Sequence, residues 1–122
     1  MATYDISTEK ELKDVMASHD IVVLDFWAPW CPPCRAFAPI LEEAAERNKD
    51  IAFCRVNAAE KQPISGEFGV STIPSLIVIR EGSVVASEQG YFDGEKLDEF
   101  LRQIRALDME ALNKEASTPA QV

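Results

Sequence analysis

Residues 21–34 read Ile-Val-Val-Leu-Asp-Phe-Trp-Ala-Pro-Trp-Cys-Pro-Pro-Cys, and this stretch decides the fold. Its first seven residues are apolar apart from Asp25, which is typical of a central strand covered on both faces. Beyond the second cysteine, apolar residues recur at helical spacing from Phe37 to about Asn48, so the sequence predicts a helix there. Cys31 is therefore expected where a buried strand ends and a helix begins.

A cysteine at a helix N-terminus has a specific chemical consequence. Unpaired backbone N–H groups and the helix dipole stabilise an anion there, so Cys31 should form a thiolate more easily than a free cysteine. A thiol with a pKa of ~8.5 is about 3% ionised at pH 7, whereas one lowered to ~7 is half ionised. Cys34 lies about one helical turn further on, within reach of a mixed disulfide formed at Cys31. The pair is predicted to carry out thiol-disulfide exchange.

The rest of the chain alternates apolar runs with amphipathic segments, which indicates a sheet with crossover helices. A capping box predicts a first helix, a glycine turn predicts a hairpin, and an apolar stripe predicts a last helix. Beyond the cysteine helix, the sequence predicts a buried strand over 51–56 and a short irregular helix over 58–68, capped by Asn57. It then predicts two hairpin strands over 75–80 and 83–88 and a last helix capped by Asp93. The first helix is expected over 9–18, before the strand that leads to the cysteines. The apolar stripe of the last helix consists of Leu97, Phe100, Leu101, Ile104 and Leu107.

Composition limits the possible functions. The chain has 122 residues, 47% of them hydrophobic and 27% charged, which corresponds to one globular domain. A formal charge of -9 repels phosphate backbones and anionic lipid headgroups, so we expect no nucleic-acid partner and no membrane partner. The N-terminus has neither a basic start nor an apolar stretch, and no segment reaches the roughly 18 apolar residues of a membrane span. The sequence therefore predicts a cytoplasmic protein.

The third cysteine raises two alternatives. The Cys-X-X-Cys pair could be half of a zinc site, but Cys54 and His19 are the only further soft ligands in the sequence, so we expect no metal. Cys54 lies between Phe53 and Arg55 on a predicted interior strand. A cysteine in that position is more often an inert small hydrophobe than a redox centre.

The segment 25–34 resembles the active-site segment of the thioredoxin family, in particular of bacterial-type thioredoxins, with Cys-Pro-Pro-Cys as its redox motif. The resemblance covers about residues 3 to 107 in the family's order and spacing. It continues through Ala38-Pro39, Val56-Asn57, Phe68-Gly69-Val70, Thr72-Ile73-Pro74-Ser75, Gly82 and Gly90. It implies an α/β thioredoxin fold, a central mixed five-stranded sheet flanked by helices on both faces. Residues 1–107 would form this domain, and 108–122 an extension with a helical start and a loose tail.

The resemblance also implies roles for individual residues. Cys31 matches the nucleophile and Cys34 the resolving cysteine, so the two would form a redox-active disulfide. Asp25 matches a buried carboxylate that assists proton transfer at the second cysteine, and burial would raise its pKa toward the working pH. Pro74 matches a cis-proline facing the disulfide, and the backbone of Ile73 would pair with an extended substrate strand.

Trp30 matches the aromatic residue that flanks the redox loop, and Trp27 the one packed beneath it. Together with Ile73 and Pro74, Trp30 and Gly90 are expected to contact substrate. One feature departs from the family, because most thioredoxins have Gly-Pro between the cysteines and this chain has Pro32 and Pro33. Pro32 removes a backbone N–H near Cys31, so we expect a nucleophile pKa somewhat higher than that of the Gly-Pro version.

The predicted function is the reduction of protein disulfides by a monomer that binds no cofactor. The family implies that its electrons come from NADPH through a thioredoxin reductase, and that its other partners are disulfide-containing proteins. Two alternatives stay open at this point. The chain could be a disulfide oxidase or isomerase, or a non-catalytic binding module of the same fold.

Overall fold

A computed structural model describes residues 2–60, 63–70 and 72–112. Strands and helices alternate along most of this length. In chain order they are β1 (Tyr4–Asp5), α1 (Glu9–Ser18), β2 (Ile21–Trp27), α2 (Pro32–Arg47), β3 (Ile51–Asn57), α3 (Pro63–Glu67), β4 (Ser75–Arg80), β5 (Ser83–Gln89) and α4 (Gly94–Arg105). The strand and the helix that flank the two cysteines therefore lie where the sequence predicts them.

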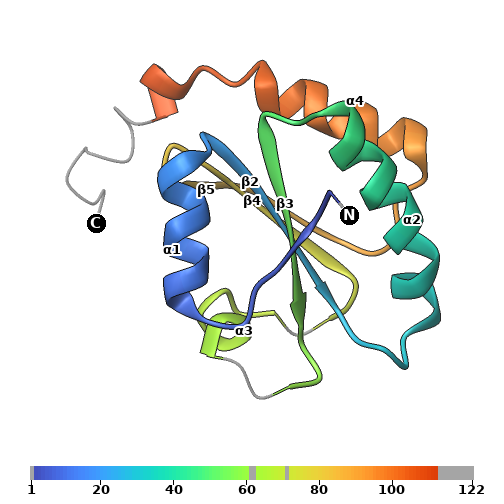
Figure 1. Cartoon of the computed structure of the whole chain (residues 1–122). Coiled ribbons are helices and arrows are strands. Elements are labelled where there is room, and N and C mark those ends of the chain that lie inside the picture. Colours follow the sequence, from blue (N-terminus) through green and yellow to red (C-terminus); the bar gives the residue numbers. More distant parts are fainter. Residues whose placement is uncertain (1, 61–62, 71, 113–122) are drawn as a thin grey trace, which may run out of the picture.

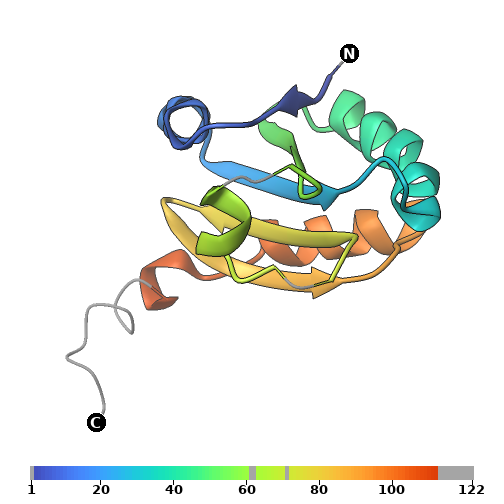
Figure 2. The same ribbon diagram turned by 90° about the horizontal axis from the view of Figure 1, so that it is seen from below.

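The strands form one mixed five-stranded sheet in the order β1-β3-β2-β4-β5. β1 and β2 both run parallel to β3, whereas β4 runs antiparallel to β2 and to β5. Figure 2 shows this order, with β1 at the top of the view and β5 at the bottom. The central position of β2 explains its nearly continuous apolar sequence, because both of its edges are paired and both of its faces are covered.

Helices cover both faces of the sheet. In Figure 1, α1 and α3 lie on one side of the strands, and α2 and α4 lie on the other. Successive side chains of β2 alternate between the two sides. Val23 packs among residues of α2 and α4, whereas Val22 and Leu24 pack in the second cluster, with residues of α1 and α3. These features confirm the predicted thioredoxin fold.

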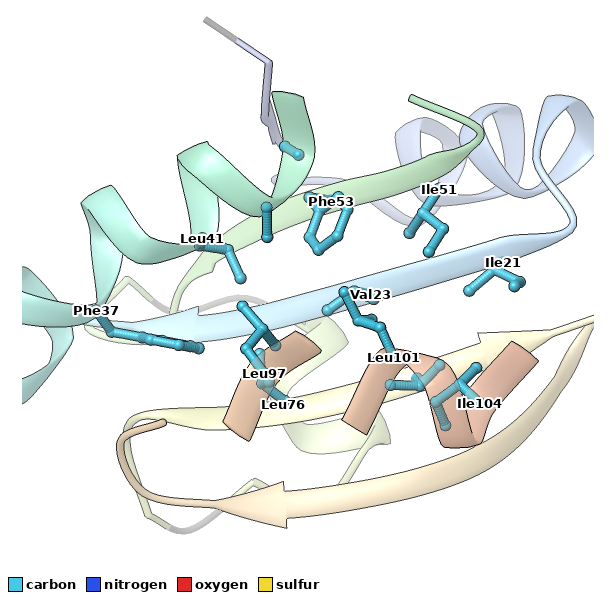
Figure 3. Close-up of a cluster of buried hydrophobic side chains, with 13 residues drawn as sticks. Ile21, Val23, Phe37, Leu41, Ile51, Phe53, Leu76, Leu97, Leu101 and Ile104 are labelled. Atoms are coloured by element: carbon cyan, nitrogen blue, oxygen red, sulfur yellow. The ribbon is translucent and has the colours of Figure 1, made fainter. Parts of the chain in front are cut away.

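The core beneath α2 and α4 supports the start of α2, where the two cysteines lie. Figure 3 shows Phe37 and Leu41 from α2 and Leu97 and Leu101 from α4 meeting over the sheet around Val23. All five side chains are buried. Burial of each such side chain contributes roughly 1.5–3 kcal/mol to the stability of the fold, so this packing holds the start of α2 in position.

Several local features match or correct the sequence-based expectations. Thr8 and Glu11 form the expected capping box, and Asp93 caps α4 by accepting the N–H of Lys96 at 2.9 Å. The prediction that Asn57 caps a helix is wrong. Its Oδ1 accepts the N–H of Ala59 at 3.0 Å in a turn, and α3 begins only at Pro63.

The end of α4 is held by an arginine from the sheet. Arg80 donates from Nη1 to the carbonyl oxygens of Ile104 at 2.9 Å and of Leu107 at 3.4 Å. The Oδ1 atom of Asp108 then accepts the N–H of Ala111 at 3.1 Å at the start of a helical turn at 109–112. A domain boundary between 107 and 108 remains a prediction, and the loose tail expected beyond 116 lies outside the described residues.

Candidate active site

Cys31 is the N-cap of α2, as its predicted place between strand and helix requires. Its Sγ accepts the backbone N–H of Cys34 at 3.3 Å, and its carbonyl oxygen accepts the N–H of Arg35 at 3.1 Å. The two residues between the cysteines are Pro32 and Pro33, which have no N–H to offer. Within the first turn of α2, the N–H of Cys34 is thus the backbone donor that reaches this sulfur. A hydrogen bond of this kind stabilises a thiolate.

Cys31 and Cys34 form a disulfide whose Cα atoms are 5.3 Å apart. Both residues are buried, with 4% and 1% of their surfaces exposed. They cluster with Ala28, and Trp27 and Ile73 pack against this cluster. The N–H of Cys31 also donates to the carbonyl oxygen of Ala28 at 3.2 Å, which fixes the loop that leads from β2 into α2.

The backbone segment that leads into β4 lies against the disulfide. The peptide bond between Ile73 and Pro74 is cis, and Pro74 is buried. The carbonyl oxygen of Pro74 accepts the N–H of Gly90 at 2.8 Å. Gly90 has a φ of +98°, which is in the range that favours glycine. No hydrogen bond to the backbone of Ile73 forms within the described part of the chain, so its N–H and C=O are open to an incoming strand.

The two tryptophans of the predicted site have different surroundings. Trp30, directly before Cys31, has 69% of its surface exposed. Trp27 is half-buried, and the Arg55 guanidinium carbon lies 4.3 Å from its ring centroid. Trp30 can therefore meet another molecule, whereas Trp27 supports the redox loop from below.

Asp25 is buried in β2, with 1% of its surface exposed. Burial raises the pKa of Asp25 to about 6, and the charge and hydrogen bond of Arg55 oppose that increase. The Nε atom of Arg55 donates to Oδ2 at 3.3 Å, whereas Oδ1 has no hydrogen-bond partner among the described residues. By the alternation along β2, Asp25 points to the same side of the sheet as Val23, the side covered by the helix that carries Cys34.

Comparison with known proteins identifies the family. The thioredoxin family model matches residues 4–103. The chain belongs to the thioredoxin family. It is 35% identical over 107 residues to putative thioredoxin 2 of Streptomyces coelicolor, covering 88% of this chain and 80% of that protein. It is 38% identical over 87 residues to the thioredoxin of Bacillus subtilis, covering 70% and 84%.

Solved thioredoxin structures agree with this assignment. A mutant thioredoxin from Halobacterium salinarum superposes with a TM-score of 0.80 at 30% identity, covering 86% of this chain and 92% of that one. The thioredoxin of Fasciola hepatica gives 0.76 at 25% identity, covering 83% and 98%. A thioredoxin with paired cysteines at this spacing is a thiol-disulfide oxidoreductase that reduces protein disulfides, and its family requires no bound cofactor.

Sequence reasoning missed the contacts that Arg55 makes with two residues of the candidate site. This residue lies on β3 directly opposite Asp25 in the parallel register and contacts both Asp25 and Trp27. A signal was present, because Arg55 is the single charged residue within the apolar run of 51–57. A cation on an interior strand needs a carboxylate partner, and the neighbouring strand offers Asp25.

Cys54 lies on the other side of the sheet from the disulfide. It is fully buried in the cluster beneath α1 and α3, as predicted for a packing residue, and burial raises its pKa to about 12. Among the described residues, no three His, Cys, Asp or Glu side chains gather in a group that could hold a metal ion. In the same ranges, no helix is long and apolar enough to cross a membrane.

Proposed function

We propose that Cys31 is the attacking nucleophile of this thioredoxin and that Cys34 resolves the intermediate. The observation that supports this assignment is the hydrogen bond from the Cys34 N–H to the Sγ of Cys31 at the start of α2. It gives Cys31 a donor for its thiolate. Cys34, in the first turn of the helix, is less exposed than Cys31, so its sulfur is proposed to react with a partner that is already attached to Cys31.

The reaction then balances in two exchange steps. The Cys31 thiolate attacks one sulfur of the substrate disulfide, and the other substrate sulfur leaves as a thiolate that takes up a proton. The Cys34 thiolate attacks the Sγ of Cys31, the second substrate sulfur leaves, and Cys31 and Cys34 become a disulfide. Two electrons pass to the substrate, which ends as a dithiol, while the protein ends oxidised.

Asp25 is proposed to take the proton from the thiol of Cys34 before the second step. Its pKa of about 6 places it close to neutrality, where a carboxylate can accept and return a proton. Oδ1, which has no hydrogen-bond partner in the described part of the chain, is the oxygen available to accept this proton, directly or through a water molecule. Arg55 is proposed to hold the other oxygen and so to orient the carboxylate.

Substrate is proposed to bind over the disulfide as an extended strand. The open backbone of Ile73 would pair with it, Trp30 would cover its side chains, and Pro74 and Gly90 would hold the segment in shape. Three residues would tune the loop. Trp27 supports it from below, while Pro32 and Pro33, both exposed, stiffen it and limit its donors.

The electrons are proposed to come from NADPH through a thioredoxin reductase, with the protein working as a cytoplasmic monomer on disulfide-containing proteins. Residues 1–107 are proposed to suffice for this activity, with 108–122 as an extension. The chain offers a single redox-active disulfide and no second redox group among the described residues, so an external donor must restore the dithiol.

The proposal is tested by insulin reduction, first with dithiothreitol and then with NADPH and a thioredoxin reductase. We expect acceleration in both assays and its loss in Cys31→Ser. No acceleration by the wild-type chain, or full activity of Cys31→Ser, would contradict the proposed roles. A reduction potential measured against glutathione would then separate a reductase from an oxidase, since an oxidase has a markedly less negative potential.

A further inference from the structure

Exposed large apolar side chains are few in the described residues, and two of them lie at the redox end of the molecule. They are Tyr4, Trp30, Val84 and Tyr91, of which Trp30 precedes the disulfide and Tyr91 follows β5. Tyr91 has 48% of its surface exposed.

A chain of contacts fixes Tyr91 at the rim of the disulfide site. Ile73 packs against the disulfide, and the next residue, Pro74, accepts the N–H of Gly90 at 2.8 Å. Tyr91 follows Gly90 directly. Its ring meets that of Phe37 edge-on, with centroids 6.1 Å apart, and Phe37 lies one turn after Cys34 on α2. The contacts thus return to the helix that carries the disulfide.

The tyrosine ring rests on a rigid support. Phe37 is fully buried and also contacts Phe92, with centroids 6.3 Å apart, and Phe92 contacts Phe100 at 5.4 Å. Edge-to-face pairs of aromatic rings are stabilised beyond the burial of their surface. The Tyr91 ring is therefore held by the protein through Phe37, while nearly half of the residue's surface is exposed.

The charges around Tyr91 favour one kind of occupant. Residues 88–96 carry three carboxylates, Glu88, Asp93 and Glu95, and one cation, Lys96, so this segment is negatively charged overall. The whole chain has a formal charge of -9, which attracts positively charged partners over distance. A lysine or arginine side chain satisfies both the negative surroundings and the electron-rich face of a tyrosine ring.

We propose that Tyr91 forms a subsite, next to the disulfide, for an arginine or lysine side chain adjacent to the reactive cysteine of the substrate. The proposal rests on the reductase function above and adds to it a preferred substrate class, extended segments in which a basic residue flanks the disulfide. Trp30 would cover the segment on one side of the disulfide, and Tyr91 would bind its basic side chain on the other.

The test uses disulfide-linked dimers of a short peptide that differ in one position, with arginine, leucine or glutamate beside the cysteine. For the wild-type protein we expect kcat/KM to be highest for the arginine peptide, intermediate for the leucine peptide and lowest for the glutamate peptide. Tyr91→Ala should lower kcat/KM for the arginine peptide about fivefold and leave the glutamate peptide within twofold, whereas Tyr91→Phe should keep the preference. The arginine advantage should shrink as ionic strength rises.

Controls separate this proposal from protein folding and from the reductase function itself. Val84→Ala truncates another exposed apolar residue, on β5, and should leave the preference unchanged. Equal losses on all three peptides in Tyr91→Ala, or a wild-type preference for leucine, would overturn the basic subsite while leaving the reductase function intact. Failure of the wild-type protein to reduce any peptide, or insulin, would instead contradict the reductase function.

Discussion

Cys31 and Cys54 are both buried, yet they stand in opposite chemical environments. Cys31 has 4% of its surface exposed and Cys54 has none. Cys31 caps a helix, accepts a backbone N–H and is bonded to Cys34. Cys54 sits in a strand among apolar side chains, where burial raises its pKa to about 12.

The contrast shows that exposure alone does not determine the reactivity of a thiol in this fold. What differs is the backbone around each sulfur. A helix N-terminus presents N–H groups and a positive dipole end to a thiolate, whereas a central strand uses its N–H groups in the sheet. Parallel pairing places Cys54 opposite Leu24 and Arg55 opposite Asp25, so adjacent residues of β3 serve packing and chemistry on opposite faces.

The largest expected effect comes from removing one member of the working pair. Cys31→Ser should lower the rate of insulin reduction by at least about 100-fold, because a hydroxyl is a far weaker nucleophile than a thiolate at neutral pH. Cys34→Ser should instead accumulate a mixed disulfide with substrate, which mass spectrometry can detect after acid quenching. A mixed disulfide trapped in Cys31→Ser but not in Cys34→Ser would reverse the two roles.

The next effect concerns Asp25, the buried carboxylate of β2. Asp25→Asn should slow insulin reduction about 10- to 100-fold, because the resolving step loses its proton acceptor. It should also stabilise the fold. Burial raises the pKa of Asp25 from its ordinary value of 3.8 to about 6, so above pH 6 the folded protein bears a carboxylate that the interior disfavours.

The stabilisation of the fold by Asp25→Asn should depend on pH. Below about pH 3.8 the carboxyl group is protonated in both folded and unfolded chains, so the substitution should leave stability nearly unchanged. Between that pH and about 6 the advantage of Asp25→Asn should grow, to about 3 kcal/mol at pH 7. Urea unfolding of both proteins across this range measures it. A constant difference at all pH values would show that the pKa of Asp25 is not raised.

Two further variants test the cause of that pKa. Arg55→Met removes the cation that lowers the pKa of Asp25, so the pKa measured by NMR titration of the carboxyl carbon should rise further. Asp14→Asn changes an exposed carboxylate that pairs with Lys10 at 2.9 Å and should alter neither activity nor the pH dependence. An unchanged Asp25 pKa in Arg55→Met would show that Arg55 does not influence the ionisation of Asp25.

A smaller effect is expected from the redox loop. Pro32→Gly introduces a backbone N–H beside Cys31, so the pKa of Cys31 should fall, as measured by thiolate absorbance of the reduced protein. Pro29→Gly introduces the same change of residue outside the helix and serves as the matched control. Equal pKa values in the wild-type protein and Pro32→Gly would show that the missing donor has no influence.

The smallest effect on activity is expected at Cys54. Cys54→Ala should keep the rate of insulin reduction within about twofold of the wild type, because this thiol faces away from the disulfide. It should lower the free energy of unfolding by about 1–2 kcal/mol through the cavity that it leaves. A large loss of activity at unchanged stability would give Cys54 a redox role.

The sequence predicted the elements whose own residues determine them. β2 has an apolar run broken only by Asp25, and α1 and α4 carry their own caps, so these three elements could be predicted locally. β1 has two residues and exists only through its pairing with β3, a long-range contact that no local pattern encodes. Asn57 was misassigned because an asparagine side chain can start a turn as readily as a helix.

The candidate site shows the same division. The cysteines, Asp25 and the Ile73–Pro74 segment could be located from motif and resemblance. Arg55 could not, because its role depends on the register between β2 and β3, which places it opposite Asp25. Tyr91 could not either, because its position at the rim follows from the hydrogen bond between Gly90 and Pro74 and from the contact with Phe37.

The central claim is that Cys31 is an activated thiol and Cys54 an inert one. It is tested most directly by alkylating the fully reduced protein over a range of pH and resolving the three cysteines by mass spectrometry. We expect Cys31 to react first, with a midpoint below the ~8.5 of a free thiol, and Cys54 to react at least about 100-fold more slowly at pH 7. Modification of Cys54 at the rate of Cys31, or a Cys31 midpoint at or above that of a free thiol, would contradict the claim.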